Sequence, residues 1–411
     1  MNIQKGWQEI QLVDVLDYEQ PNEYIIKKPL KKDENLTPVL TANKSFIKGY
    51  TDERNGIYNN LPVIIFDDFT ADTKFVDFPF KVKSSAMKIL KSKNKNILLK
   101  FVFYQMQLNK MDTTTHRRYY ISKYQDLKFL FPTNKDNTID LQKQIIIVSE
   151  IEKQLTRLEE SIKSLNDIKK NIDIYRMSVL KSVFAGNILS KDNFETKQID
   201  VLGLLIGVCA SWKIGKISDL GEYRRGKSKH RPRDDPILYG GKYPFIQTGE
   251  ITNAKTRLTA YLKTYNEEGL RQSKLWKKGT LCITIAANIA YTAILDFDAC
   301  FPDSVVGFTS SSETTAYFVM YYIKYIQSLI ESKASATAQK NINIATLSEI
   351  AIPVLNIDTQ SKIVEEIESK FSIAEKIENV SDQSIFKVKT LKSSILKEAF
   401  EGNLVKFEEQ K

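Results

Sequence analysis

A run of cations in the second half of the chain is the feature best suited to chemistry with a partner. Residues 224–233 read Arg-Arg-Gly-Lys-Ser-Lys-His-Arg-Pro-Arg, six formal positive charges in ten residues with no acid. Glycine, serine and proline in the run predict a loop rather than a helix. Arginine and lysine on such a loop can neutralise phosphates, and an arginine fork can pair with a guanine edge. We therefore expect a DNA contact here, with a merely solvated charged loop as the plainer alternative. The candidate contacts are Arg224, Arg225, Lys227, Lys229, His230, Arg231 and Arg233.

The start of this stretch imitates a phosphate-binding loop of nucleotide-hydrolysing enzymes. Gly221-Glu-Tyr-Arg-Arg-Gly-Lys-Ser228 fits the pattern G-x-x-x-x-G-K-[ST]. Such a loop must lead into a helix whose N-terminus binds the phosphates. Pro232 and Pro236 oppose a helix directly after Ser228. We interpret the match as chance, and a nucleoside triphosphatase is the disfavoured alternative.

Other catalytic chemistry has few residues to use. The chain has two histidines, His116 and His230, and three scattered cysteines, Cys209, Cys282 and Cys300. That is too little for a histidine-based metal site, a Ser-His-Asp triad or a disulfide framework. An amino-methyltransferase would carry an Asp/Asn-Pro-Pro-Phe/Tyr motif, and the chain contains no Pro-Pro. The sequence predicts a binding protein with no catalytic residue, no metal and no cofactor of its own.

Polar side chains at five further positions of the second half are candidate DNA contacts. Gln247 follows a Gly-Gly turn, and its amide suits an adenine edge. Asn288 and Tyr291 interrupt a strand pair among small residues, and Gln339 and Lys340 precede the closing strand. The corresponding loops of the first half carry a different set of candidates. These are Thr70, Lys74, His116, Arg117 and Arg118, with Lys44, Lys48 and Arg54 as weaker ones.

The candidates fall into two halves because the chain is an internal duplication. Residues 178–188 and 394–404 are identical at six of eleven positions. The same shift of 216 aligns residues 144–152 with 360–368, with six identities in nine. Each half also opens on a tryptophan followed seven residues later by aspartate, at Trp7 and Trp212. Whatever the chain does, we expect it to do twice, on a target with two halves.

Each half pairs a globular stretch with a long helix. Short apolar runs between turn residues predict a mixed fold of short strands, with helices near residues 98–110 and 315–332. Apolar residues then recur every seven positions, which predicts two helices packed on each other within the chain. The repeated positions are Ile151, Leu158, Leu165, Ile172 and Val179, and then Ile367, Ala374, Ser381, Val388 and Ile395. Gly186 and Gly402 stand where helix C-caps belong.

These patterns divide the 411 residues into six segments. The expected order is a domain over 1–140, a helix over 141–187, a linker over 188–211, a domain over 212–356, a helix over 357–405 and a tail over 406–411. We expect the apolar run Val201–Ala210, about half the length of a membrane span, to be a packed connector.

The overall composition indicates which kind of partner and which cellular compartment to expect. A hydrophobic content of 42% is sufficient for folded cores, and a net charge of +10 favours a polyanionic partner. We expect no signal peptide, and the sparse cysteines fit a reducing interior. We expect a cytoplasmic protein with no membrane partner.

Five stretches together resemble a known family. They are residues 78–90, 225–236, 239–249, 282–288 and 299–308. The Gln-x-x-Ile-Val-x-Glu-Ile-Glu openings at Gln144 and Gln360 add to them, as does the order domain, helix, domain, helix. Over nearly its whole length the chain resembles the specificity (S) subunit of type I restriction–modification systems.

The resemblance implies a fold class and a set of partners. The fold would be α+β, with two mixed α/β globular target-recognition domains separated by two long antiparallel coiled-coil helices in an internal duplication. Each domain would read one half of a bipartite site on double-stranded DNA, and the helices would fix the spacing. Two modification (M) subunits would carry S-adenosylmethionine and methylate adenine N6. Restriction (R) subunits, where present, would use ATP, and the S subunit would do no chemistry.

The first half departs from the second at one feature. It has no counterpart to the basic loop, because residues 17–32 mix three acids with four lysines. DNA contacts therefore cannot be transferred from one half to the other at this point. Two alternatives remain: the specificity partner of a type IIB-like system, and a two-headed coiled-coil scaffold that does not bind DNA.

Overall fold

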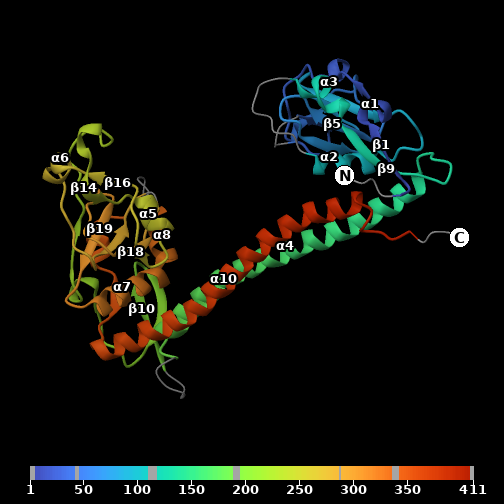
Figure 1. Ribbon diagram of the computed structural model, residues 1–411. Coiled ribbons are helices and arrows are strands. Elements are labelled where there is room, and N and C mark those ends of the chain that lie inside the picture. Colours follow the sequence, from blue (N-terminus) through green and yellow to red (C-terminus); the bar gives the residue numbers. More distant parts are fainter. Residues whose placement is uncertain are drawn as a thin grey trace. The chain divides into compact units, whose positions relative to one another are not determined.

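The computed structural model describes residues 5–41, 46–109, 118–187, 195–286, 288–335 and 342–407 (Figure 1). It divides into two compact units. The first contains Met1–Asn166 and Asp382–Lys411, and the second contains Asp167–Ser381. Each unit therefore combines one globular domain with parts of both long helices. No helix in the described ranges is long and apolar enough to cross a membrane.

The first domain is built on the four-stranded antiparallel sheet β2-β8-β5-β6. Its central strand β5 is the apolar run Val63–Asp67, which is buried at all five positions. A second sheet, β4-β3-β7, and the pair β1-β9 complete the domain. Its elements are β1 Trp7–Gln11, α1 Leu12–Val15, β2 Leu16–Glu19, η1 Pro21–Tyr24, β3 Thr37–Leu40, β4 Ile47–Thr51, β5 Val63–Asp67, β6 Thr73–Val76, β7 Lys81–Val82, β8 Met87–Ser92, α2 Leu99–Leu108, α3 Tyr119–Ser122, η2 Tyr124–Asp126 and β9 Lys128–Pro132.

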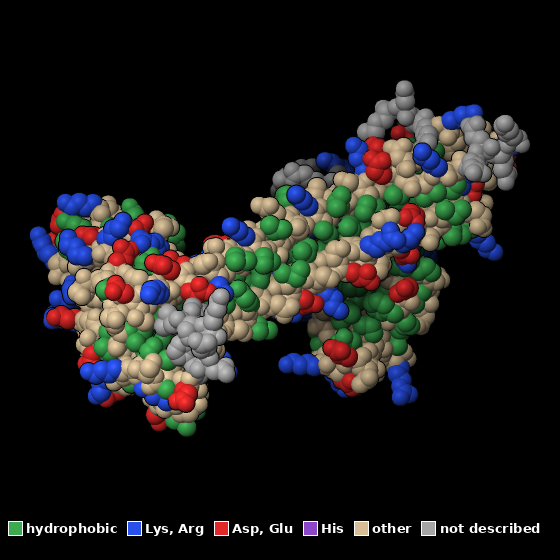
Figure 2. Space-filling view, turned by 90° about the horizontal axis from the view of Figure 1, so that it is seen from below, with side chains coloured by type: hydrophobic (Ala, Val, Ile, Leu, Met, Phe, Trp, Pro, Cys, Tyr) green, Lys and Arg blue, Asp and Glu red, His purple; other side chains and the backbone are tan. Residues whose placement is uncertain are grey.

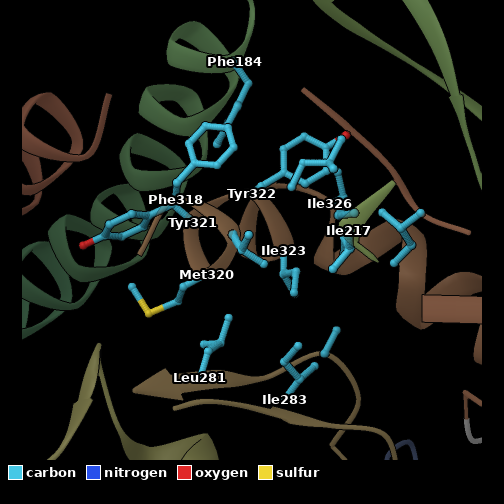
Figure 3. Close-up of a cluster of buried hydrophobic side chains, with 14 of the residues drawn as sticks. Phe184, Ile217, Leu281, Ile283, Phe318, Met320, Tyr321, Tyr322, Ile323 and Ile326 are labelled. Atoms are coloured by element: carbon cyan, nitrogen blue, oxygen red, sulfur yellow. The ribbon is translucent and has the colours of Figure 1, made fainter. Parts of the chain in front are cut away.

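The second domain has the five-stranded sheet β13-β19-β17-β18-β15 and the pairs β10-β11, β12-β20 and β14-β16. Its strands are β10 Thr196–Val201, β11 Leu204–Cys209, β12 Ile214–Lys216, β13 Glu222–Arg225, β14 Tyr239–Phe245, β15 Arg257–Leu258, β16 Lys263–Tyr265, β17 Leu281–Thr284, β18 Thr292–Leu295, β19 Val305–Thr309 and β20 Ala351–Pro353. Its helices are η3 Ile217–Asp219, η4 Pro236–Leu238, α5 Thr248–Asn253, α6 Glu267–Arg271, α7 Glu313–Tyr325, α8 Gln327–Ser335 and α9 Ile344–Ser348. Figure 3 shows Met320 and Ile323 of α7 directed toward Leu281 and Ile283 of β17, so this helix covers the sheet.

The two sheets confirm the duplication. The order β2-β8-β5-β6 in the first domain corresponds to β13-β19-β17-β18 in the second, with antiparallel pairing throughout. In both domains the segment that closes on proline returns to pair with the opening strand, as Trp7 with Pro132 and Ile214 with Pro353. The pairing registers make Tyr18 equivalent to Tyr223, because they lie opposite Leu90 and Phe308.

The long helices are α4, Leu141–Phe184, and α10, Ile357–Phe400, with 44 residues each. At 1.5 Å per residue each is roughly 65 Å long. In the first unit the start of α4, including Ile151, packs with the end of α10, including Leu396. In the second unit the end of α4, including Val183, packs with the start of α10, including Ile363. The helices are therefore antiparallel, and all ten predicted seam positions are buried or half-buried.

Both helices end in the same way. Gly186 and Gly402 have φ of +90° and +77°, in the left-handed region that glycine enters without strain. The next residue in each case, Asn187 or Asn403, donates its N–H to the carbonyl five residues earlier. The predicted C-caps are confirmed.

Two expectations about local structure were wrong. The helix expected over 315–332 is divided at Ile326 into α7 and α8. The stretch expected as a linker over 188–211 contains the hairpin β10-β11, which reverses at Leu202 and Gly203, both with positive φ. The hairpin forms because Val201 and Val208 bury against the core of the second domain.

Candidate nucleic-acid interface

The basic segment leaves the sheet as strand β13 and continues without a helix. Arg225, Lys227 and Lys229 are exposed, and the alternate residues Gly226 and Ser228 are buried. Backbone hydrogen bonds from Gly226 to Val305 (2.8 Å) and from Lys227 to Phe301 (3.0 Å) hold this stretch on the domain. A side chain at Gly226 would lie 2.3 Å from a carbonyl oxygen, so glycine is required for the close approach.

The three exposed cations form what we call the basic row: Arg225, Lys227 and Lys229. Within the described part of the chain none of their side chains has a hydrogen-bond or ion-pair partner, although the backbone N–H of Lys229 donates to the side-chain oxygen of Gln272. Their alternate exposure places them on one side of an extended backbone. Consecutive members are then roughly 6.5 Å apart along the chain. A row of this kind can follow a charged phosphate backbone.

The other charged residues of the segment hold its shape. Arg231 donates to the carbonyls of Ser228 (2.7 Å) and His230 (2.8 Å). His230 contacts the Asp235 carboxylate at 2.8 Å, and Arg233 pairs with Asp303 at 2.6 Å. The backbone N–H of Ile237, and then His230, lower the pKa of Asp235. Arg224 pairs with Glu222 at 3.4 Å. The sequence predicted all seven residues as contacts; the structure separates a basic row from residues that brace the loop.

The backbone of this segment is not that of a nucleotide-binding loop. Gly221–Ser228 includes strand β13 and lies on the sheet, and no α-helix follows before η4. There is thus no helix N-terminus at Ser228 to bind phosphates.

The remaining candidates of the second domain lie around α5. Gln247 is exposed at its N-terminus, where its N–H donates to the Glu250 carboxylate at 2.8 Å. The amide of Asn288 donates to the hydroxyl of Thr252 on the same helix at 3.1 Å. Asn288 and Tyr291 belong to the turn between β17 and β18, which Thr284 organises by hydrogen bonding to the backbone of both. The structure therefore brings Gln247, Asn288 and Tyr291 into one region.

The first domain builds the equivalent turn with different residues. The Asp67 carboxylate accepts the N–H groups of Phe69 (2.8 Å) and Thr70 (3.1 Å). Ala71 has φ of +55° two residues before β6, just as Ala290 has φ of +59° two residues before β18. Thr70 and Lys74 are exposed on or beside this turn. The exposed Arg118 is adjacent to it, because Tyr119 donates its N–H to the Asp68 carbonyl at 2.9 Å.

Not every candidate can be placed. Lys48 and Arg54 are exposed at the three-stranded sheet, away from this turn. Lys44, His116, Arg117, Gln339 and Lys340 lie outside the described residues. Where the second domain has Arg224, the register gives the first domain Glu19, whose carboxylate binds Tyr24 and Lys91. At this position the first half therefore has a paired acid where the second half has an arginine.

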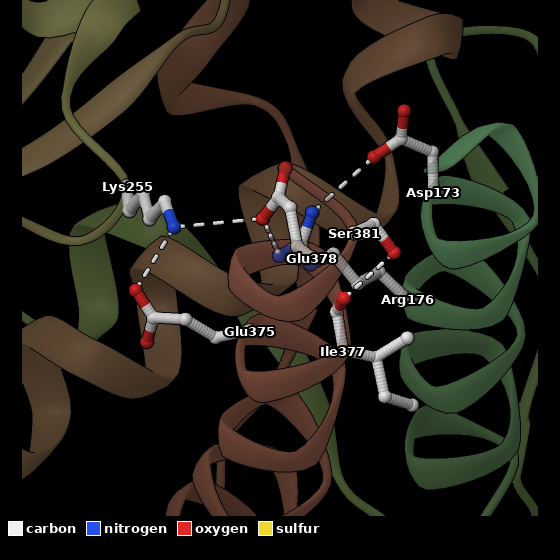
Figure 4. A network of polar contacts seen from close by, with 7 residues as sticks. All are labelled: Asp173, Arg176, Lys255, Glu375, Ile377, Glu378 and Ser381. Carbon is white, nitrogen blue, oxygen red and sulfur yellow. Dashed lines mark hydrogen bonds and ion pairs between the residues drawn. The ribbon is translucent and has the colours of Figure 1, made fainter. Parts of the chain in front are cut away.

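A polar network missed by sequence reasoning connects the second domain to both long helices (Figure 4). Lys255, in the segment before β15, pairs with Glu375 at 2.9 Å and Glu378 at 3.5 Å. Glu378 also pairs with Arg176 of α4 at 2.9 Å, and Arg176 chiefly lowers its pKa. A cavity of about 610 Å³ beside the network is lined by these helices and by Tyr291. Tyr291 and the two long helices thus line one cavity.

Comparison with known sequences points to one family. The family described as type I restriction modification DNA specificity domain matches residues 210–385. The EcoR124I/EcoR124II type I restriction enzyme specificity subunit of Escherichia coli is 29% identical over 376 residues, covering 86% of this chain and 84% of that protein. The EcoBI specificity subunit of the same organism is 23% identical over 282 residues, covering 64% and 57%.

Solved structures share the fold. A chain from a study of complex assembly and conformational transition of the type I restriction–modification system has a TM-score of 0.69 at 15% identity, covering 98% of this chain and 100% of that one. The HsdS subunit from Thermoanaerobacter tengcongensis has a TM-score of 0.55 at 15% identity, covering 98% of each chain. In its duplicated domains, its paired helices and these matches, the chain is similar to type I restriction–modification specificity subunits, and residues 210–385 match the DNA specificity domain of that family.

Proposed function

We propose that the protein is the DNA-sequence-recognition subunit of a type I restriction–modification complex. The observation that carries this proposal is one sheet topology used twice with different loops on it. Equivalent positions hold Glu19 and Arg224, and equivalent turns are organised by Asp67 and Thr284. A common frame with unlike loops is what two unlike half-sites require, so each domain reads one half of a bipartite site on double-stranded DNA.

In the second domain, different residues would contact the phosphates and the bases. The basic row provides exposed charges for phosphates, which set position without reading sequence. Gln247, Asn288 and Tyr291 provide amide and aromatic groups suited to base edges and stacking. In the first domain Thr70, Lys74 and Arg118 are the described candidates for the same task.

The long helices have two tasks in this proposal. They set the distance between the half-sites, and they bind two modification subunits. Figure 2 shows apolar side chains exposed along the helices between charged ones. The exposed large apolar residues of the two helices are Ile145, Ile146, Ile168, Ile174, Tyr175, Met177, Ile357, Ile373, Ile377, Val380, Phe386 and Leu391. Surface helices seldom expose so many large apolar groups unless a partner covers them.

The chemistry belongs to the partners. The modification subunits bind S-adenosylmethionine and methylate adenine N6, and restriction subunits, where present, use ATP to move along and cleave DNA. This chain positions both on a chosen site and has no catalytic residue of its own. The type IIB-like alternative differs only in the partner, and genes adjacent to this one distinguish it.

Single-molecule sequencing of adenine methylation tests the proposal, in the native host and in a strain with this gene deleted. We expect one bipartite motif with a fixed gap that disappears on deletion. Unchanged methylation in the deletion strain, in a host where the modification subunits are expressed, contradicts the proposal. The scaffold alternative then gains support, and it further predicts DNA binding that is weak and insensitive to salt.

A further inference from the structure

One backbone hydrogen bond recurs at the same point of both domains. The N–H of Tyr119 donates to the carbonyl of Asp68 at 2.9 Å, and the N–H of Ile342 donates to the carbonyl of Ile285 at 3.0 Å. Asp68 follows the last residue of β5, and Ile285 follows the last residue of β17. In each domain this bond joins the turn after the central strand to the end of the loop that precedes the closing segment. Both loops carry candidate DNA contacts.

The side chains at this joint differ between the domains. Phe66 lies opposite Lys88, and its equivalent Ile283 lies opposite Val306, so Asp68 and Lys88 correspond to Ile285 and Val306. Asp68 and Lys88 are 3% and 1% exposed, and their charged groups are 3.5 Å apart. Ile285 and Val306 are 2% and 0% exposed and belong to the apolar core. A buried ion pair in one domain therefore takes the place of an apolar contact in the other.

The ion pair gives the loop end a second tether. The other carboxylate oxygen of Asp68 accepts the N–H of Tyr120 at 3.1 Å. Lys88 fixes the orientation of that carboxylate and also lies over the ring of Tyr18, 5.2 Å from its centroid. The Tyr18 ring in turn meets the ring of Tyr120 edge-on at 5.5 Å. An isoleucine and a valine at these positions could fill the space but could not hold a backbone N–H in one direction.

Stability alone does not explain the charged pair. Replacing a buried ion pair by well-packed apolar residues is often neutral or stabilising, whereas removal of one partner strands a buried charge. The second domain shows that this fold accepts the apolar version at the equivalent positions. The charges fix the direction of the Asp68 carboxylate, and so of the Tyr120 N–H that it accepts, at the junction of the two loops.

We propose that Asp68 and Lys88 are positioning residues for DNA reading by the first domain. Together they hold the turn that carries Thr70 and the loop end that carries Arg118 in one arrangement. The base preference of the first half-site depends on that arrangement. This inference rests on the proposed function, and it adds a role for two buried residues that do not contact DNA.

The test transfers the second domain's apolar pair into the first domain as Asp68→Ile with Lys88→Val. The full-length variant is assembled with its modification subunits, and adenine methylation is measured on DNA libraries randomised in one half-site at a time. We expect discrimination at the first half-site to fall about tenfold, with the second half-site unchanged and the melting temperature lowered no further than in the control variant described below. An unchanged preference at the first half-site in a folded variant overturns the proposal.

Two further variants keep the result interpretable. Gln144→Leu is the matched control, because Gln144 is a fully buried polar residue of the first unit that bonds to the backbone of Leu98 and Asn96, not to the turn. Gln144→Leu should lower the melting temperature and leave both half-site preferences intact. If this variant lost preference at the first half-site, destabilisation alone would be enough to cause that loss, and the proposal would be overturned.

If the isoleucine–valine variant does not fold, Asp68→Asn with Lys88→Met replaces it. This pair retains an oxygen for the Tyr120 N–H and removes the charges. We expect discrimination between bases to fall at least about threefold at the first half-site only. Unchanged discrimination there overturns the proposal. A wild-type complex that methylates no bipartite motif refutes the proposed function itself, which is a separate outcome.

Discussion

The ring of Phe400, the last residue of α10, packs edge-on against the ring of Phe101 in the first domain, with the centroids 5.1 Å apart. Phe184, the last residue of α4, meets Phe318 of the second domain at 5.8 Å. Phe101 and Phe318 both lie in a Phe-Val-x-Tyr segment, in α2 and α7. Each domain is therefore completed by the end of the helix that follows the other domain. The first unit is therefore formed from two separate stretches of the chain, and the second from the single stretch Asp167–Ser381.

This crossing predicts that truncating each ring will destabilise the unit in which its helix ends. Phe400→Ala should destabilise the first unit and Phe184→Ala the second, each by about 3–5 kcal/mol, because a buried phenylalanine leaves a cavity. Hydrogen exchange followed by mass spectrometry checks this, since amide protection can be compared between the two domains. Each variant is the control for the other, because each should lower protection in one domain and leave it unchanged in the other. Loss of protection in the domain that precedes each helix in the sequence would contradict the prediction.

The helical frame was predictable because its signal is periodic and long. Seven-residue spacing over five heptads is independent of the partner's sequence, and the seam from Ile151 to Val179 is buried or half-buried as expected. The turn carrying Asn288 was predictable in outline, since small polar residues interrupt two apolar strands. Local sequence was sufficient for both.

Features that depend on distant partners were not predictable. Lys88 sits in a strand next to apolar residues, and only its distant partner Asp68 makes its burial acceptable. Lys255 appears as an ordinary surface charge until the fold brings it to Glu375. The hairpin β10-β11 was missed because Leu202 adopts positive φ, which a leucine rarely does. In each case the deciding contact is made by tertiary packing.

The basic row should govern affinity more than sequence preference. Replacing Arg225, Lys227 and Lys229 by alanine should weaken binding to specific and nonspecific DNA alike. The slope of log affinity against log salt should fall by about one for each phosphate that the row no longer neutralises. Fluorescence anisotropy over a range of salt concentrations measures this. Lys277→Ala is the charge control, since Lys277 is exposed but pairs with Asp298 at 2.8 Å; a similar drop in slope for that variant would contradict the special role of the row.

Lys324 should make the stability of the second unit depend on pH. Burial, and secondarily Arg176, lower the pKa of its amino group from 10.5 to about 8. Because the unfolded chain binds this proton more tightly, folding is penalised below about pH 8 and the penalty is relieved as pH rises toward 10.5. Lys324→Met should therefore stabilise the unit at neutral pH, by on the order of 1 kcal/mol.

Thermal unfolding of wild type and Lys324→Met from about pH 7 to about pH 9 isolates this effect. The advantage of the methionine variant should shrink as pH rises. Lys333→Met is a control, because Lys333 is exposed on α8 and its replacement should give no such trend. A constant difference between wild type and Lys324→Met at all pH values would mean that the amino group is not the cause.

The last prediction concerns the spacing between the half-sites. The pair Arg176–Glu378 fixes the antiparallel register of α4 and α10, so an added turn must be placed in both helices at the same level. Inserting about four residues near Leu165 and near Val388 lengthens each helix by roughly 6 Å. We expect the methylated motif to keep both half-sites and to gain a longer unread gap, as read by single-molecule sequencing. Insertion in α4 alone should shift α4 against α10 along the seam and abolish methylation. This single insertion therefore distinguishes an effect of lost helix packing from an effect of helix length on the gap. If the double insertion changed the bases of a half-site while the gap stayed the same, the helices would not be acting as the spacer.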